Sequence, residues 1–286
     1  MNIACSSILL SGEQPEPKNR PTAMRYAYLR PKHSQHMTRE EILQIKSLSK
    51  RSERKKRGLF IVEGVKNILE LASSPIELER IYYTQGMDEH IPEQLIPSST
   101  VLSSKEMERC SQMKTPPGIL AVAQIPNRNA NQILQELPNR KLPFALVADG
   151  IQDPGNLGTL IRSIEWFGLN AVFVTPSTTD PWSTKCVQAS MGSIFKVPVL
   201  DWTSDSISAA ASLQNFAMDL DGTPYDAVSW SPGLIWIGSE SHGLQEAKQI
   251  EHEKITIPRF GRAESLNAGV AGSIACAEVA KSYQGT

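Results

Sequence analysis

Short apolar runs alternate with longer segments of helical spacing along the second half of the chain. The strand-like runs are Phe144–Ala148, Ala171–Thr175, Val197–Leu200, Phe216–Asp219, Leu234–Ile237 and Ile255–Ile257. Most of them are separated by helical segments. This alternation predicts an α/β fold with a mainly parallel sheet and helices on both faces.

The first half begins with a helical pattern and continues as a smaller α/β module. Thr38 and Glu41 have the spacing of a capping box, and Ile42, Ile45 and Leu48 follow at helical intervals. This helix is expected to run into the basic stretch at 50–57. Beyond it we expect strands at 59–62, 78–83 and 119–125 and helices at 68–72 and 105–112.

The pattern is weak before and between these two modules. Residues 1–37 contain four prolines and no hydrophobic period, which predicts a disordered leader, with Met37 as an alternative start of translation. Residues 127–142 are expected to form a linker with a short helix at 133–137. The predicted parts are therefore a leader (1–37), a front domain (38–126), a linker (127–142) and a C-terminal domain (143–286).

Composition places the chain among soluble globular proteins. Of its 286 residues, 40% are hydrophobic, an ordinary value. No apolar run approaches the ~20 residues that a membrane helix requires, and the N-terminus lacks the basic lead-in of a signal peptide. We therefore expect a cytoplasmic protein without a membrane partner.

The net charge of −1 conceals a strong asymmetry. Residues 1–57 contain 13 Lys and Arg against 5 Asp and Glu, and the remaining residues contain 16 against 25. A basic leading segment on an acidic body indicates a polyanionic partner, although a solvated helix face would explain the same run. The candidate phosphate-binding residues are Lys50, Arg51, Arg54, Lys55, Lys56 and Arg57.

Cysteine and histidine spacing gives no sign of a metal site. Cys5, Cys110, Cys186 and Cys276 are far apart, and no C-x-x-C pair occurs. The five histidines offer no ligand spacing either. We expect buried free thiols and no metal.

Three loops follow predicted strand ends, where open α/β sheets bind their ligands. The first, 149–158, is rich in glycine and leads into a helix expected at 159–167, with Arg162 about one turn inside it. A helix N-terminus under such a loop favours an anion. The plain alternative is a strand-turn-helix capped by Asn156, with Arg162 in a surface ion pair.

The second and third loops each carry polar residues among glycines. The second, 235–244, ends an apolar strand and contains one carboxylate, Glu240. The third, 257–267, opens a helix rich in Ala and Gly, expected at 268–280. Taken singly, they are explained by a solvated turn and by close helix packing after a Ser cap.

Together the three loops resemble the SpoU (TrmH-like) branch of the SPOUT superfamily of RNA methyltransferases. The motifs that carry the resemblance occur in order: Asn156, Gly158 and Arg162; Gly238-Ser239-Glu240 with Gly243-Leu244; and Ile257-Pro258 with Ser265-Leu266-Asn267. The segment 189–193 also resembles the family. The resemblance covers Phe144 to Tyr283 and extends weakly to the front module at 57–64 and 115–122.

The resemblance implies a C-terminal fold with a deep trefoil knot, a rare exception to unknotted topology, behind a ribosomal-protein-like front domain. It implies S-adenosylmethionine held by backbone around Gly238, Ile257 and Leu266. It also implies a homodimer that methylates a ribose 2′-hydroxyl in structured RNA, with ribosomal RNA favoured over transfer RNA.

The resemblance further casts Arg162 as the residue that deprotonates the ribose hydroxyl. Its hydrogen-bonding frame would be Asn156, Glu240, Ser265 and Asn267. Because free arginine has a pKa above ~12, an alternative is that Arg162 stabilises the alkoxide while a phosphate oxygen or water takes the proton.

The sequence departs from the family at Ser241, where Gly is usual, and at Ala268-Gly269, where Val-Ser is usual. Ser241 is expected to narrow the cofactor loop. A Rossmann enzyme is a poorer interpretation, since no G-x-G-x-x-G follows a strand. A non-catalytic RNA-binding or ribosome-assembly factor on the same scaffold is the alternative from another functional class.

Overall fold

The computed structural model describes residues 37–240 and 242–284. The predictions for the leader before Met37 and for Ser241 therefore lie outside the described residues. Met37 itself is buried against the core of the front domain.

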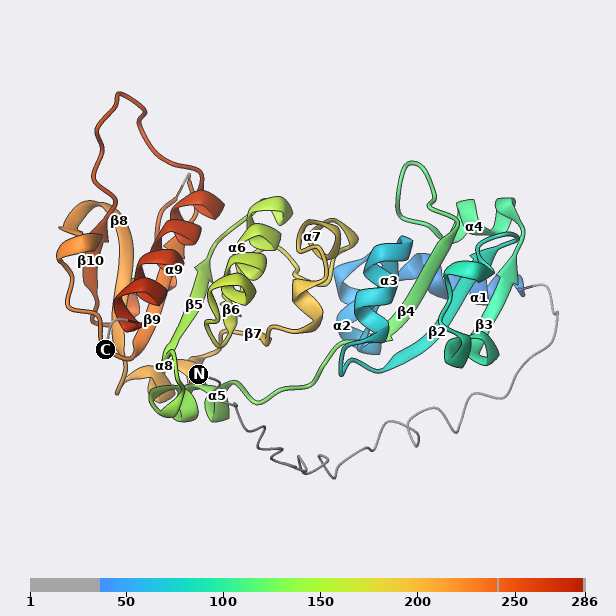
Figure 1. Cartoon of the computed structure of the whole chain (residues 1–286), viewed down its shortest axis with the longest axis horizontal. Coiled ribbons are helices and arrows are strands. Elements are labelled where there is room, and N and C mark those ends of the chain that lie inside the picture. The colour runs from blue at the N-terminus through green and yellow to red at the C-terminus, as the bar shows by residue number, and fades with distance from the viewer. Residues whose placement is uncertain (1–36, 241, 285–286) are drawn as a thin grey trace, which may run out of the picture.

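The front domain is a small α/β unit (Figure 1). In chain order it contains α1 (Arg39–Ser47), α2 (Arg51–Arg57), β1 (Leu59–Glu63), α3 (Val65–Ala72), β2 (Leu78–Thr84), the 3-10 helices η1 (Asp88–His90) and η2 (Glu93–Ser98), β3 (Ser99–Leu102), α4 (Ser104–Cys110) and β4 (Ile119–Gln124). Within the described residues, its strands form one sheet in the order β1-β4-β2-β3. The β2–β3 pair is parallel and the others are antiparallel.

Two details of this domain differ from the prediction. The expected helix through residue 57 is divided into α1 and α2, because Leu48 turns into the core and Arg54 Nη1 donates to its carbonyl oxygen at 2.6 Å. That bond satisfies a carbonyl at the helix end, where intrahelical partners are lacking. Strand β3 was not predicted, since its Ser99 and Thr100 give no apolar run.

The C-terminal domain confirms the predicted parallel α/β sheet. After α5 (Ala130–Glu136) and η3 (Leu137–Asn139) come β5 (Phe144–Asp149), α6 (Pro154–Phe167), β6 (Val172–Val174), α7 (Thr184–Ala189), η4 (Ser193–Phe195), β7 (Val199–Asp201), α8 (Ser204–Ala210), β8 (Gln214–Pro224), η5 (Tyr225–Ala227), β9 (Gly233–Gly238), η6 (Glu246–Gln249), β10 (Glu253–Thr256) and α9 (Ala268–Gln284). In the described chain the strand order is β10-β8-β9-β5-β6-β7, with every pairing parallel.

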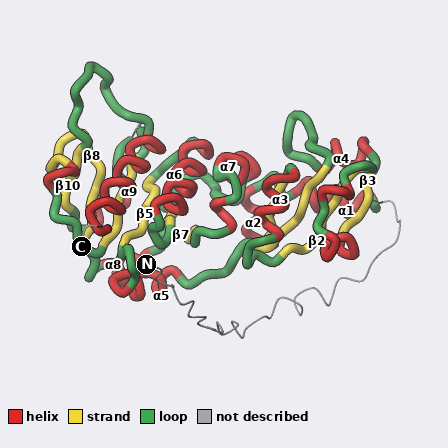
Figure 2. Tube along the Cα trace, in the orientation of Figure 1, coloured by secondary structure: helices red, strands yellow, loops and turns green. Residues whose placement is uncertain are grey.

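Helices cover both faces of this sheet, as Figure 2 shows. Alternate residues of β5 face opposite sides: Phe144 and Leu146 join the hydrophobic cluster with α6, α7 and α9, and Ala145 and Val147 join the cluster with α5 and α8. The predicted linker is more than a spacer, because its Leu134 is buried in the second cluster.

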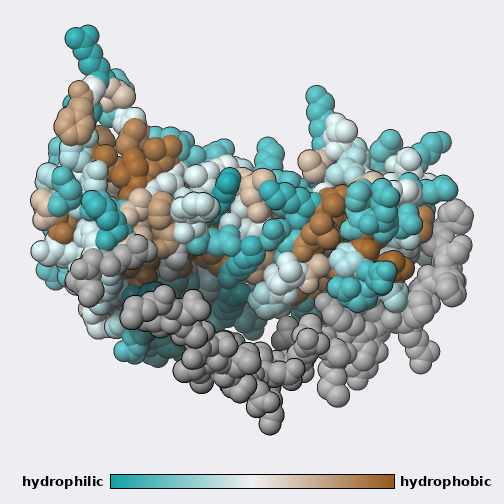
Figure 3. Space-filling view, viewed as in Figure 1, coloured by the Kyte–Doolittle hydropathy of each residue, from teal (hydrophilic) through white to brown (hydrophobic). Residues whose placement is uncertain are grey.

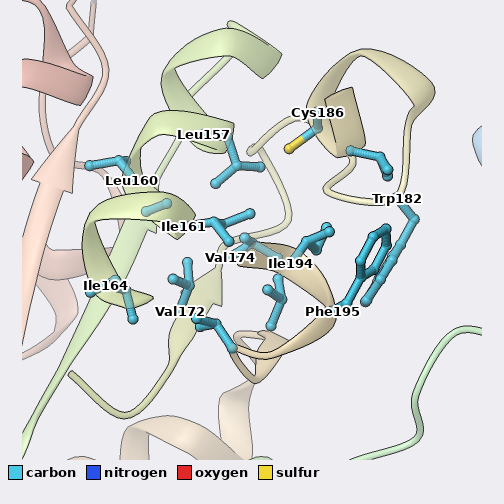
Figure 4. Packing of buried hydrophobic residues seen from close by; sticks show 14 of the residues in the cluster. Leu157, Leu160, Ile161, Ile164, Val172, Val174, Trp182, Cys186, Ile194 and Phe195 are labelled. Atoms are coloured by element: carbon cyan, nitrogen blue, oxygen red, sulfur yellow. The ribbon is translucent and has the colours of Figure 1, made fainter. Parts of the chain in front are cut away.

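The two domains share one hydrophobic core. Phe60 of β1 packs against Trp182 and Phe195, with ring centroids 4.8 Å and 6.3 Å apart. Figure 4 shows Trp182 and Phe195 on one side of this cluster, opposite the apolar side chains of α6. At its rim, Lys196 pairs with Glu70 at 2.9 Å and Glu165 at 3.2 Å. Buried contacts therefore fix the front domain against α6 and α7.

Candidate active site

The loop after β5 is tightly held and leads directly into α6. Gly150 has a φ of +74°, and its N–H donates to the hydroxyls of Thr175 at 3.1 Å and Thr178 at 3.0 Å. Such a φ favours glycine. The loop is therefore fixed at the carboxyl edge of the sheet, where the other two loops also begin.

Asp153, rather than Asn156, caps α6. Its carboxylate accepts from the Asn156 N–H at 2.9 Å, and Pro154 occupies the first turn. The helix therefore begins at Pro154 instead of the expected Thr159. The capping role considered for Asn156 is wrong, and its side chain is left to reach across the loop.

Hydrogen bonds join the three loops through Asn156. Its Nδ2 donates to Glu240 Oε1 at 2.8 Å, and its Oδ1 accepts from Asn267 Nδ2 at 2.8 Å. Glu240 Oε1 also accepts from the N–H of Ala268 at 3.2 Å, at the start of α9. Asn267 Oδ1 accepts from Val270 N–H, so Asn267 rather than Ser265 caps α9.

Arg162 stands apart from this network. It is exposed on α6 and has no hydrogen bond or ion pair among the described residues. The surface ion pair considered for it is therefore not seen, and its guanidinium is available to a ligand. Ser265 is also exposed and makes no hydrogen bond within the described chain.

A cavity of about 530 Å³ opens beside Glu240, within the range typical of small-molecule sites. The predicted cofactor residues Gly238, Ile257 and Leu266 line it, as do Glu240 and Ser265; the lining covers residues 218–220, 237–240, 243–244, 256–261, 263–266, 268 and 271. The second and third loops therefore form the cavity wall, and the first loop contacts that wall through Asn156.

Bare backbone forms one side of this cavity. A Cβ on Gly238 would lie 2.6 Å from the Gly243 carbonyl carbon, closer than non-bonded carbons approach. Ser239 and Gly243 are linked by two backbone hydrogen bonds that close the turn. Gly238 therefore permits a tight turn whose peptide groups can approach a ligand.

One residue that shapes the cavity was missed by sequence reasoning. Asp149, fully buried at the end of β5, accepts through one carboxylate oxygen from the N–H groups of Gln245 at 2.6 Å, Glu246 at 2.8 Å and Ala247 at 3.2 Å. It thereby holds the segment that follows the cavity residues Gly243 and Leu244. An aspartate ending an otherwise apolar strand was the available signal.

Small residues bring α9 against α6. A Cβ on Gly272 would lie 2.3 Å from Leu160 Cδ2, and Ser163 Oγ lies 2.6 Å from Ser273 Oγ. The predicted helix at 268–280 is observed as Ala268–Gln284. Gly269 is one of the positions where the sequence departs from the family. A Cβ at this position would lie 3.3 Å from Thr159 of α6, so the usual Ser would make a tight contact with that helix.

The predicted RNA-binding run on α2 is only partly exposed. The structure corrects the prediction for Arg54: it is 5% exposed, and its guanidinium forms an ion pair with Asp180 across the domain junction. Arg51 and Arg57, though exposed, donate to the carbonyl oxygens of Thr178 and Gln44. Lys50 and Lys56 are exposed and have no ion pair in the described chain, and the exposed Lys55 lies 4.0 Å from Asp201 Oδ2.

The described cysteines are buried free thiols. Burial raises the pKa of Cys110 to about 11 and of Cys276 to about 12, and it raises the pKa of Cys186 as well. These thiols are therefore protonated and inert near neutral pH. Among the described residues, no cluster of His, Cys, Asp and Glu could hold a metal ion, and no helix is long and apolar enough to cross a membrane.

Two family models match the chain. The model of the SpoU rRNA Methylase family matches residues 143–277, and that of the MRM3-like substrate binding domain matches residues 39–121. A similar relative is the 23S rRNA (guanosine(2553)-2′-O)-methyltransferase RlmP of Bacillus subtilis, 29% identical over 80% of this chain and 91% of its own. The mitochondrial rRNA methyltransferase 3 of Xenopus laevis is 24% identical, and the match covers 72% of this chain but 54% of that protein.

Solved structures of the same fold cover most of the chain. An AdoMet-bound rRNA methyltransferase from Sinorhizobium meliloti has a TM-score of 0.75 at 24% identity, over 87% of this chain and 97% of that one. An RNA 2′-O ribose methyltransferase has a TM-score of 0.66 at 25% identity, over 85% and 96%. Both similarities extend across the two domains.

Proposed function

The chain belongs to the SpoU rRNA methylase family, and we propose that it transfers the methyl group of S-adenosylmethionine to a ribose 2′-hydroxyl of ribosomal RNA. The observation that carries this proposal is the cavity beside Glu240, whose walls are the second and third motif loops. Asn156 of the first loop is hydrogen-bonded to Glu240 and Asn267. Two motifs thus line the cavity, and the third is linked to its wall through Asn156.

The residues around the cavity fit this cofactor. Ile237, Ile257 and Leu266 supply apolar surface for an adenosyl group, and Gly238 and Gly243 bring backbone without side chains to the cavity wall. Asp149 keeps the segment after that turn in place. When bound, S-adenosylmethionine supplies a sulfonium methyl group to an oxygen that approaches in line with the bond being broken.

Arg162 is the proposed catalytic residue. Its guanidinium has no protein partner in the described chain, so it can contact the ribose oxygen as that oxygen loses its proton. A permanent positive charge stabilises the developing alkoxide, and a phosphate oxygen or water accepts the proton. The proposed frame of the ribose consists of Asn156, Glu240, Ser265 and Asn267, of which Asn156, Glu240 and Asn267 are hydrogen-bonded to one another.

We also propose that the C-terminal segment is threaded as a trefoil knot. In support, β10 lies at the outer edge of the sheet beyond β8, yet the chain returns over 257–267 to α9, which packs on α6 and β9 further inside. Figure 1 shows this long return loop rising above the domain. A knot of this kind would keep the cavity walls together.

A homodimer is proposed from apolar side chains exposed on α6, on α9 and in the loop before α9. Trp166 of α6 is 82% exposed, and Leu266 of the loop and Val270 of α9 are about half exposed; such side chains are candidates for burial between two copies of the chain. Figure 3 shows hydrophobic side chains gathered near the foot of the return loop. Sedimentation of the protein tests this proposal: a monomer at micromolar concentration would contradict it.

Lys50, just before α2, and Lys55 and Lys56 on α2 remain proposed RNA contacts, as do Arg51 and Arg57 through their remaining N–H groups. Arg54 is left out because Asp180 engages it. A cytoplasmic location is likewise proposed, by analogy with the bacterial relative.

Comparison of ribose methylation across total RNA tests the proposed function. A deletion strain and its parent are mapped for 2′-O-methyl sites, and the protein is then supplied with unmodified large-subunit ribosomal RNA and labelled cofactor. We expect one site to lose methylation in the strain and to regain it in vitro. Loss of a transfer RNA site instead would move the substrate to that class, and no lost site in any RNA would refute the activity.

A further inference from the structure

Gln188 on α7 is the centre of a surface to which both domains contribute. Its Nε2 donates to the Glu63 carbonyl oxygen at 2.7 Å and lies 3.9 Å from Met113 Sδ. Its Oε1 accepts from Asn67 Nδ2 of α3 at 3.0 Å. One side chain therefore joins α7, the start of α3 and the loop before β4.

Three exposed lysines are within two residues, along the chain, of residues that make this contact or hydrogen-bond beside it. Lys66 adjoins Asn67 on α3. Lys185 adjoins Thr184, whose hydroxyl donates to Gln112 Oε1 at 2.7 Å, and Lys114 follows Gln112 by two residues. Within the described residues none of the three lysines has an ion pair.

Several carboxylates of the neighbouring elements have other partners. Lys196 pairs with both Glu70 and Glu165. Glu63 is fully buried and accepts from Ser111 Oγ and the Gln112 N–H, and Asp153 caps α6. None of these carboxylates forms an ion pair with the three lysines in the described chain, so the ammonium groups are available to a polyanion.

Met191 adds an outward-facing apolar side chain to this surface. It is the one non-glycine residue with positive φ in the described chain, at +52°, and it is 42% exposed. A left-handed conformation is unfavourable for a residue with a Cβ, and such strain is typical of functional sites. The next residue, Gly192, sits where a Cβ would be 2.9 Å from Glu70, so the turn packs directly on α3.

This surface continues to the proposed catalytic residue. Gly158 of α6 lies so close to α7 that a Cβ on it would meet the Ala189 Cβ at 2.5 Å, and Arg162 is one turn further along α6. Figure 1 shows α7 between α6 and α3. An extended ligand bound at the domain junction could therefore continue along α6 to Arg162.

We propose that this junction surface, defined as Lys66, Met113, Lys114, Lys185 and Met191, binds the RNA strand that presents the target ribose. The proposal rests on the proposed function and adds a binding surface distinct from α2. The lysines contact phosphates. The two methionines, whose flexible side chains suit adaptable binding surfaces, contact unstacked bases, the part of RNA that sequence-specific proteins bind. RNA is favoured over a protein partner because the free charges are all positive.

A charge-matched pair of triple variants tests the lysines. K66Q/K114Q/K185Q is compared with K46Q/K105Q/K141Q, which removes the same charge from exposed positions elsewhere. Binding of in vitro-transcribed large-subunit ribosomal RNA is measured at several KCl concentrations. We expect the junction variant alone to lose about ten-fold or more in affinity, with the slope of log affinity against log salt reduced by about 2.

Met191→Gly tests the strained residue without endangering the fold, since glycine accepts a positive φ. We expect an unchanged or higher Tm, an unchanged Kd for S-adenosylmethionine and a several-fold higher KM for RNA. A merely structural role for Met191 would leave KM for RNA unchanged.

The two proposals fail in different ways. If the wild type methylates RNA but both triple variants bind it equally well, the junction surface is refuted and the function stands. If Met191→Gly also keeps the wild-type KM, the methionine contact falls with it. If the wild type transfers no methyl group to any RNA, the function fails and so does the inference built on it.

Discussion

The two edges of the six-stranded sheet are built differently. At the β7 edge, Arg54 and Asp180 form an ion pair whose side chains are 6% and 12% exposed, and Phe60 packs on Trp182 across the domain junction. At the β10 edge, Leu220 is 71% exposed and Phe260 is 98% exposed beside the cavity. One edge is fixed to the front domain, and the other is open to a small ligand.

The two edges are therefore expected to serve different functions. The fixed edge sets the distance between the front domain and α6, so RNA held at the junction meets Arg162 in one geometry. The open edge holds the cavity and its loops. Variants at the fixed edge are therefore expected to change stability, and variants at the open edge are expected to change activity. A residue between the two edges should show the largest effect on catalysis.

Arg162 lies between the two edges, and its removal is the largest expected effect. Arg162→Ala should lower kcat for methyl transfer by about 10²–10³-fold, the usual cost of losing one group that stabilises a transition-state oxyanion. Because Arg162 has no partner in the described chain, Tm and the Kd for S-adenosylmethionine should not change. Methyl incorporation, calorimetry and thermal melts measure these quantities; near-normal turnover would remove Arg162 from the mechanism.

At the fixed edge, Arg54→Gln should destabilise the fold. Removing one partner of a buried ion pair leaves the other uncompensated and costs about 3 kcal/mol or more. Chemical denaturation measures the change, and Lys56→Gln on the same helix, which is exposed, is the matched control. The double variant Arg54→Gln/Asp180→Asn should lose less than the sum of the single variants, and strict additivity would argue against the pair.

At the open edge, Asn156→Ala should impair activity with little effect on stability. It removes the hydrogen bonds to Glu240 and Asn267, so the three loops lose their common link. We expect kcat/KM to fall by about ten-fold or more and Tm to stay within a few degrees. Ser163→Ala, about two turns further along the same face of α6, serves as control, and equal losses in both variants would indicate a general effect on the helix.

The smallest expected effect concerns Glu63 at the fixed edge. Burial raises the pKa of this carboxyl, against hydrogen bonds from Ser111 and Gln112 that lower it. A raised folded-state pKa means that its stabilising contribution is complete below the ordinary value of 4.5 and declines as the pH rises through the folded-state pKa. Glu63→Gln should therefore gain in Tm relative to the wild type between pH 4 and pH 8. A Tm difference that is constant with pH would show that Glu63 does not titrate differently on folding.

The sheet could be predicted from sequence because its strands are covered on both faces. Such strands are apolar at nearly every position, as in β5 and β9, so they stand out without an alignment. The elements that escaped prediction, β3, α7 and α8, are short and polar. Their structure depends on tertiary pairing, which a local pattern does not contain.

The site could also be predicted only in part, because some of its residues are marked by sequence motifs and others only by contacts in the fold. Asn156, Glu240 and Asn267 were found because the family motifs mark them, and the fold brings them together. Asp149 was missed because its role depends on which backbone N–H groups lie beside it. Arg54 was misassigned because a basic residue in a basic run looks solvent-facing until its buried partner Asp180, far away in sequence, is known.

The pairing of β5 with β9, which joins Phe144 to Gly233 and Asp149 to Gly238, has a consequence for biosynthesis. Strand β5 leaves the ribosome well before β9 and α9, yet the cluster that joins the two domains includes Ile237 of β9 and Val279 of α9. Since domains generally fold as units, the core at the domain junction is completed only when the C-terminal elements have been made. A prematurely terminated chain would thus lack the cavity walls and part of the core that holds the two domains together.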